Sequence, residues 1–293
     1  MRRSAAKFVP PGLPIVRSVE ALRGTLAGWR RDGRRIGLVP TMGSLHDGHL
    51  ALVRRGLEAG EAVVVSIFVN PTQFGPNEDF SAYPRSEAED AAKLEAIGAH
   101  LVWAPPVDAM YPPHFSSYVS VEGLTDGLDG PHRPGHFRGV ATIVSKLLLQ
   151  VLPDTAYFGE KDYQQLQVIR RLVRDLDIPV VIAGVPTVRD PDGLALSSRN
   201  LYLTPEERKI AATLPMVLAE TTEAAAAGIA SFPELLRAAR AALAEAGFGS
   251  IDYLQICDAE TLAPVDRLDR PARIFVAIRL GRTRLIDNMP IGR

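Results

Sequence analysis

Hydrophobic positions in the first two thirds of the chain alternate between short unbroken apolar runs and longer stretches with apolar residues at helical spacing. The runs lie at residues 36–39, 62–70, 100–103, 155–159 and 179–185. Strands that are apolar throughout are buried on both faces, as in parallel sheets. Between them, stretches such as residues 163–176 carry the apolar stripe of an amphipathic helix. This alternation predicts an α/β fold with a doubly wound, Rossmann-like parallel sheet and right-handed crossovers.

Capping signals predict where several helices begin. Ser18 is placed to cap the first helix, and Ser86 with Glu89 three residues later has the spacing of a capping box. Thr204 with Glu207 has the same spacing near the start of the last third of the chain.

Two segments between the predicted elements are less regular. Residues 118–121 are expected to form a further strand. Residues 127–139 combine basic and imidazole groups with Gly and Pro, so they predict a mobile basic loop that acts as a lid rather than a helix. The next helix is expected to begin at about Val140.

The pattern changes after Val188, where a turn-forming cluster and then two helices precede two long strands. The helices are expected after residue 204 and at 233–246, the strands at 251–256 and 272–280, and a hairpin partner at 283–288. This order is typical of α+β structure. We therefore expect a Rossmann-like domain at residues 1–187 and a smaller α+β domain at residues 188–293.

Composition argues against several classes of protein. The chain has 293 residues with 33 basic and 34 acidic side chains, a balance that argues against a nucleic-acid-coating surface. Its one cysteine, Cys257, lies in an apolar run and is expected to be a buried thiol in a protein of a reducing compartment. The chain contains no apolar run of the ~20 residues that a membrane span needs, and its first residues lack the apolar core of a signal peptide. These features predict a cytoplasmic protein.

The stretch VPTMGSLHDGH, residues 39–49, joins a predicted strand to a helix through a glycine-containing turn. The first N–H groups of a helix have no partner within it and attract anions. His46 and His49 lie on one face of the first turn and could reach one phosphate. The same pair is equally consistent with half of a metal site, which would need a third ligand. The turn is neither a Walker loop nor a G-x-G-x-x-G turn.

Polar clusters follow four of the predicted elements, at residues 41–49, 70–73, 159–165 and 197–200. Ligands of open parallel sheets bind outside the carboxyl ends of the strands, so we expect these clusters to meet. Lys161 and the Ser197-Ser198-Arg199 segment suit phosphate oxygens, although that segment also fits a surface turn. Asp162 suits ribose hydroxyls or a helix cap. The amides of Gln73 and Gln165 suit a hydroxy acid, although exposed glutamines are common.

Four long motifs, PTMGSLHDGH, FVNPTQFGPNEDFSAYPR, YFGEKDYQQL and LSSRNLYL, occur in this order. With these motifs the chain resembles the pantoate–β-alanine ligase family, within the wider H-x-G-H nucleotidylyltransferase superfamily. The resemblance implies condensation of pantoate with β-alanine, in which ATP activates pantoate as an adenylate and AMP is released. It also implies Mg²⁺ with the ATP, and a homodimer with residues 62–70 as a candidate contact region. Leu196 stands where the family usually has Met.

The resemblance also assigns roles to the first domain and to individual residues. Residues 1–187 would bind nucleotide and pantoate. His46, His49, Lys161 and Arg199 would be catalytic, with His49 as a proton donor and an imidazolium among the positive groups. Gln73 and Gln165 would bind pantoate, with Gln73 also near β-alanine, and Asn70 and Arg133 would lie near the substrates. Asp79, Glu89 and Asp90 are candidate outer ligands of Mg²⁺, with no ligand singled out. The residues implied to contact ATP are Met42, Gly43, Ser44, Leu45, His46, Asp47, Gly48, His49, Gly159, Glu160, Lys161, Asp162, Val188, Leu196, Ser197, Ser198 and Arg199.

Two other classes stay open from the residues alone. Another H-x-G-H nucleotidylyltransferase would share the histidine motif but has no reason to keep NPTQF and GEKDYQQ. A nucleotide-binding protein without turnover would use the same phosphate-binding groups. A class I tRNA synthetase is disfavoured, because the C-terminal third has no basic excess for tRNA binding.

Overall fold

A six-stranded parallel sheet forms the centre of the N-terminal part of the protein. In this computed structural model, which describes residues 12–75, 80 and 83–292, the strand order is β1-β4-β3-β2-β5-β6. The strands are β1 (Ile15–Val16), β2 (Ile36–Thr41), β3 (Ala62–Ile67), β4 (Leu101–Trp103), β5 (Thr155–Gly159) and β6 (Val181–Val185). All five neighbouring pairs are parallel, so the predicted doubly wound sheet is confirmed.

The chain order reverses between β2 and β5, because β3 and β4 lie on one side of β2 while β5 and β6 lie on the other. The β2–β5 ladder pairs only Gly37 with Thr155 and Leu38 with Ala156, although both strands continue further. Pro40 in β2 has no N–H to donate. The carboxyl ends of these two strands are therefore not paired with each other, at the topological switch point where such sheets bind ligands.

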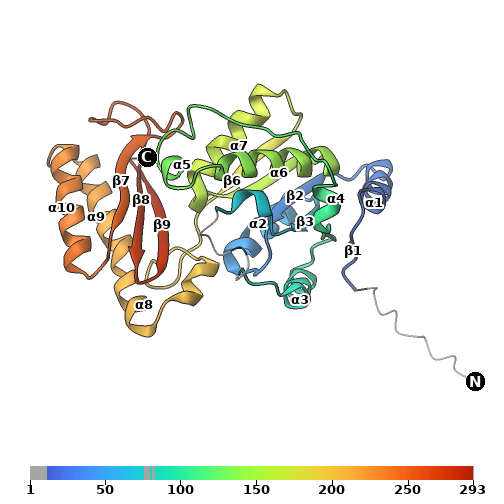
Figure 1. Cartoon of the computed structure of the whole chain (residues 1–293), viewed down its shortest axis with the longest axis horizontal. Helices are drawn as coiled ribbons and strands as arrows, with labels where there is room; N and C mark the ends of the chain where they lie inside the picture. Colours follow the sequence, from blue (N-terminus) through green and yellow to red (C-terminus); the bar gives the residue numbers. More distant parts are fainter. Residues whose placement is uncertain (1–11, 76–79, 81–82, 293) are drawn as a thin grey trace, which may run out of the picture.

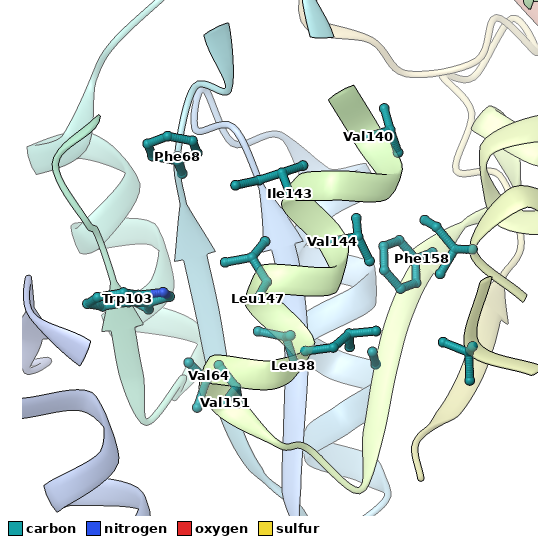
Figure 2. Close-up of a cluster of buried hydrophobic side chains, with 14 of the residues drawn as sticks. Leu38, Val64, Phe68, Trp103, Val140, Ile143, Val144, Leu147, Val151 and Phe158 are labelled. Carbon is teal, nitrogen blue, oxygen red and sulfur yellow. The ribbon is translucent and has the colours of Figure 1, made fainter. Parts of the chain in front are cut away.

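Helices cover both faces of this sheet. Neighbouring strand residues point to opposite faces, so Leu38 packs with α6 on one face while Val39 packs with α2 on the other. Figure 2 shows Val144, Leu147 and Val151 of α6 beside the sheet side chains of the same cluster. The helices of this part are α1 (Val19–Arg31), α2 (Asp47–Glu58), α3 (Glu87–Ile97), α4 (Val107–Met110), α5 (Asp129–His132), α6 (His136–Val151) and α7 (Tyr163–Asp175).

The C-terminal part is a three-stranded antiparallel sheet, and its two longest helices, at residues 213–226 and 232–245, lie on the side away from the parallel sheet (Figure 1). The Thr204–Glu207 capping box is confirmed, but the helix expected after residue 204 is divided at Ala212. The α+β prediction is confirmed, while a domain boundary at residue 187 remains a proposal. The elements are η3 (Ser198–Tyr202), α8 (Pro205–Ala211), α9 (Thr213–Ala226), α10 (Phe232–Glu245), β7 (Ile251–Asp258), β8 (Ala272–Leu280) and β9 (Thr283–Ile291).

The expectations for residues 118–139 are wrong in part. Residues 118–121 form no strand, and residues 129–132 form α5. Gly135, with a φ of 81°, takes the N-cap position of α6, so this helix begins at His136 rather than Val140. Tertiary contacts hold the segment, because the buried Asp129 carboxylate accepts hydrogen bonds from Tyr253 and Arg284. Local Gly and Pro content gives no sign of these partners.

Two smaller expectations also change, and others concern residues that the structure does not describe. Ser86 makes no side-chain capping bond to α3. The contact region proposed at residues 62–70 is wrong for the strand itself, because Ala62–Ser66 of β3 are buried in the middle of the sheet. Asp79 and residues 1–11 lie outside the described residues. Among the described residues, no helix is long and apolar enough to cross a membrane.

Candidate active site

A cavity of about 230 Å³ lies beyond the carboxyl ends of β2, β3 and β5. Its walls come from the loops that follow these strands, from α6 and from the segment after β6. The topology thus brings together the four polar clusters, as expected. The site residues of the sequence analysis that line it are Met42, His46, Gly48, His49, Asn70, Gln73, Arg133, Gly159, Lys161, Asp162, Gln165, Val188, Leu196, Ser197, Ser198 and Arg199.

A carboxylate from α3 holds part of the turn before α2, residues 43–45, away from the cavity. The backbone N–H groups of Ser44 and Leu45 each donate to Asp90 at 2.8 Å. Gly43, with a φ of 83°, donates its N–H to the Thr41 hydroxyl. Two of the expected phosphate-binding donors are therefore already occupied, and Asp90 itself is fully buried. The structure does not bring Gly43, Ser44 and Leu45 to the lining.

Asp47 and Glu160 also lie away from the lining. Asp47 is exposed and its carboxylate lies 3.9 Å from Arg54. The Glu160 carboxylate pairs with Arg273 of β8 at 3.0 Å, and its carbonyl accepts a hydrogen bond from the Asn288 amide of β9. Glu160 therefore fastens the loop after β5 to the C-terminal sheet.

His46 and His49 line the cavity, and each uses Nδ1 to accept a backbone hydrogen bond. Nδ1 of His46 accepts from the Gly48 N–H at 3.2 Å, and Nδ1 of His49 accepts from the His46 N–H at 3.4 Å. A neutral imidazole that accepts at Nδ1 carries its proton on Nε2. The two rings, with centroids 4.1 Å apart, thus offer two Nε2–H donors.

Both histidines are neutral near pH 7. Burial lowers the pKa of His49 to about 3, with a further contribution from His46. Burial and the nearby Lys161 lower the pKa of His46. Neutral rings differ from the imidazolium expected at this site, because its charge would be poorly solvated in this place. The permanent positive charge at the cavity comes from Lys161 and the arginines.

Asp162 is an ionised carboxylate among cations. Desolvation between the cavity walls alone would raise the pKa of its carboxyl, but Lys161 and Arg199 outweigh this and lower it. Its carboxylate lies 3.6 Å from the Lys161 ammonium. Although Asp162 occupies the N-cap position of α7, its side chain makes no capping hydrogen bond there. Of its two predicted roles, the acceptor for ligand hydroxyls fits this geometry.

Gln73 is held in place by its neighbours. Its Oε1 accepts from the Asn70 amide at 3.0 Å, and its Nε2 lies 3.2 Å from the Met42 sulfur. Asn70 is 1% exposed, and its amide also donates to Gly139 O while its Oδ1 accepts from Tyr111. Because its polar atoms are used within the protein, Asn70 positions Gln73. The side-chain amide of Gln165 has no hydrogen-bond partner in the described part of the chain, so it is available to a ligand.

His136 is a site residue that the sequence analysis missed. Its Nδ1 donates to the Gln73 carbonyl at 2.9 Å, and its Nε2 lies 2.9 Å from an Arg133 guanidinium nitrogen. The buried imidazole therefore links two residues of the cavity wall. The only signal was the spacing in HRPGH, which alone predicts no partner.

The segment after β6 closes the cavity over the start of α2. The N–H of Leu196 donates to the Val188 carbonyl, and the hydroxyl of Ser197 accepts from the N–H of Arg199. A Cβ on Gly48 would lie 3.8 Å from Leu196 and only 2.8 Å from the His46 ring. Glycine is thus required for this close packing. The described residues contain no group of three His, Cys, Asp or Glu side chains placed to hold a metal ion.

The comparisons with known proteins agree across the chain. The family model described as Pantoate-beta-alanine ligase matches residues 14–290. Pantothenate synthetase of Paramagnetospirillum magneticum is 59% identical over 277 residues, covering 94% of this chain and 97% of that protein. The crystal structure of pantothenate synthetase from Thermus thermophilus has 50% identity and a TM-score of 0.90, covering 96% of this chain and all of the other.

A further similar structure was solved with ligands bound. It is the pantoate-beta-alanine ligase of Francisella tularensis, complexed with beta-gamma ATP and beta-alanine. It is 33% identical, with a TM-score of 0.80, and the match covers 95% of this chain and 98% of that chain.

Proposed function

The chain belongs to the pantoate–β-alanine ligase family, and we propose that it condenses pantoate with β-alanine at the expense of ATP. The products are pantothenate, AMP and pyrophosphate, and the intermediate is pantoyl adenylate. This is the ligase step of coenzyme A biosynthesis.

One observation carries this proposal. The same cavity is lined by phosphate-binding groups and by two side-chain amides, those of Gln73 and Gln165. The Nε2–H groups of His46 and His49, with Lys161 and Arg199, suit an ATP triphosphate, while Asp162 suits its ribose hydroxyls. The amides of Gln73 and Gln165 suit the hydroxyl and carboxylate groups of pantoate. A cavity for nucleotide alone would not need the two glutamines.

The reaction needs charge stabilisation rather than a protein nucleophile. In the first step the pantoate carboxylate attacks the α-phosphorus, and the bond to pyrophosphate breaks. Negative charge grows on the phosphoryl oxygens and the leaving group, where fixed N–H donors and cations are most effective. Pyrophosphate leaves with this charge. The β-alanine amine then attacks the activated carbonyl carbon, the bond from this carbon to the phosphate oxygen breaks, and AMP and the amine proton are released. The lone Cys257 takes no part, because burial raises the pKa of its thiol to about 12.

Mg²⁺ would accompany ATP and screen its phosphates. The described residues offer no protein cage for it, and Asp90 is already bound to the turn before α2. Mg²⁺ commonly keeps several waters and binds substrate phosphates, so a site made mainly by the nucleotide fits this lining. We also propose a cytoplasmic homodimer, to be tested by its mass in solution.

Substrate dependence tests the reaction against the alternatives. Pyrophosphate release should require both ATP and pantoate, and AMP release should require β-alanine as well. Pyrophosphate release without pantoate would indicate a different nucleotidylyltransferase and overturn the proposal. ATP binding without release of either product would indicate a protein that binds nucleotide without turnover.

A further inference from the structure

A second, larger cavity of about 650 Å³ adjoins the proposed active site and extends to the C-terminal sheet. The two cavities share five lining residues, which are Arg133, Lys161, Asp162, Ser197 and Arg199. The histidines His46 and His49 and the two glutamines of the proposed active site line the smaller cavity alone. The shared residues therefore lie on the border between the two cavities.

The second cavity carries excess positive charge. Five arginines and Lys161 line it, against three carboxylates. Each carboxylate already faces a cation, and none of the three pairs includes Arg279 or Arg282. The pairs are Asp162 with Lys161, Asp252 with Arg284, and Asp287 with Arg189.

Two of these arginines, Arg279 and Arg282, line the larger cavity alone. Arg279 is near the end of β8 and Arg282 is in the turn before β9, and both side chains are exposed. In the described part of the chain, neither guanidinium group has a hydrogen bond or an ion pair. Their charge is therefore available to an anion that enters the cavity.

The direction of the adenylation step determines which anion this is. In an in-line displacement the attacking and leaving oxygens lie on opposite sides of phosphorus. Gln73 and Gln165, which are proposed to hold pantoate, line the smaller cavity alone, whereas Lys161 and Arg199 line both cavities. An attack from the side of the glutamines would place the leaving oxygen on the side of Lys161 and Arg199, toward the larger cavity.

We propose that the larger cavity receives pyrophosphate and that Arg279 and Arg282 bind it after it leaves. This inference rests on the proposed function and extends it to the release of the first product. The bond from the α-phosphorus to the bridging oxygen breaks, and that oxygen stays with pyrophosphate. The pantoate carboxylate forms the new bond to phosphorus, so no proton or further reactant is needed.

The test uses the full chain with both residues changed, Arg279→Gln and Arg282→Gln. Arg237→Gln is the matched control, because Arg237 is an exposed arginine of the same C-terminal part and lines neither cavity. Binding of inorganic pyrophosphate is measured by calorimetry, and its product inhibition is measured against ATP. The double variant should weaken both by about tenfold or more, as expected for lost charge-assisted hydrogen bonds. The KM for pantoate should not change.

Unchanged pyrophosphate binding and inhibition in the double variant would overturn the inference, because Lys161 and Arg199 would then suffice. If the double variant and Arg237→Gln lose pyrophosphate binding equally, the inference is also overturned, because the loss would then be a general effect of removing positive charge. A second double variant, Arg279→Gln with Arg282→Lys, keeps one charge. It should bind pyrophosphate more tightly than the variant with two glutamines. Calorimetry needs no turnover, so its result is separate from the substrate-dependence assay: a wild-type protein that forms no pantothenate would overturn the proposed function instead.

Discussion

Asp90 and Ser44 are joined by a hydrogen bond of 2.8 Å, from the backbone N–H of Ser44 to a carboxylate 46 residues further along the chain. The other carboxylate oxygen accepts from Leu45 N–H. A buried protein carboxylate thus takes the place that a phosphate could have occupied on this turn. The ligand phosphates are left with the side chains of α2 and the neighbouring loops.

Asp90→Asn should therefore destabilise the protein. The substitution removes the charge from two hydrogen bonds and turns an amide N–H₂ toward a backbone N–H. We expect it to lower the free energy of unfolding by about 2 kcal/mol, as measured by urea unfolding. Glu89→Gln is the control, because Glu89 is exposed on the same helix and should leave stability within about 0.5 kcal/mol. Equal effects of the two variants would contradict the role of Asp90.

Gly48→Ala should impair catalysis with little effect on folding. The new Cβ would lie 2.8 Å from the His46 ring, so the imidazole must move away from its position. We expect a fall in the adenylation rate of about tenfold to a hundredfold, since small displacements of positioned groups are costly. Gly24→Ala is the matched helical control, because a Cβ there meets nothing within 4 Å. It should stabilise the protein by up to about 1 kcal/mol and leave the rate unchanged.

His49→Ala should lower the adenylation rate more than it weakens ATP binding. The variant loses one Nε2–H donor to the developing charge, an effect of about 10²–10³ in rate for comparable donors. Single-turnover release of pyrophosphate gives the rate, and nucleotide titration gives the binding constant. A variant with normal turnover would remove His49 from the mechanism.

The lowered pKa of His49 makes stability depend on pH. The pKa is about 3 in the folded protein and about 6.5 in an unfolded chain, so between these values the unfolded chain binds more protons. The full contribution to stability is present above pH 6.5 and is lost as the pH falls toward 3. Relative to His49→Gln, the wild type should lose about 1–2 kcal/mol between pH 7 and pH 5 in urea unfolding. Parallel stability curves would show that His49 titrates normally.

His136→Ala should affect the organic substrates rather than ATP. The imidazole connects the Gln73 carbonyl to Arg133, so its loss loosens both residues. We expect the KM for pantoate to rise about tenfold, with the KM for ATP within about twofold. His136→Asn, which can still reach one partner, should recover part of the effect. A uniform fall in kcat with unchanged KM values would indicate a general structural role.

Local patterns in the sequence determined the sheet and the main site motifs. Runs such as residues 62–67 are apolar on both faces and form a strand only when covered on both sides, so their position could be predicted. The convergence of His46, Gln73, Lys161 and Arg199 followed from the same topology, because parallel strands end at one edge. The family resemblance supplied their chemical roles.

The tertiary structure decided what each side chain faces. Asp90 reached the turn at Ser44, Glu160 turned to Arg273, and Asp129 fixed a segment expected to be a loop. These partners lie 46, 113 and 124 residues apart, beyond any local pattern. Burial likewise made His49 neutral. Sequence thus determined which groups are present at the site, whereas packing determined their charge, their partners and the second cavity, because these depend on distances that only the folded chain defines.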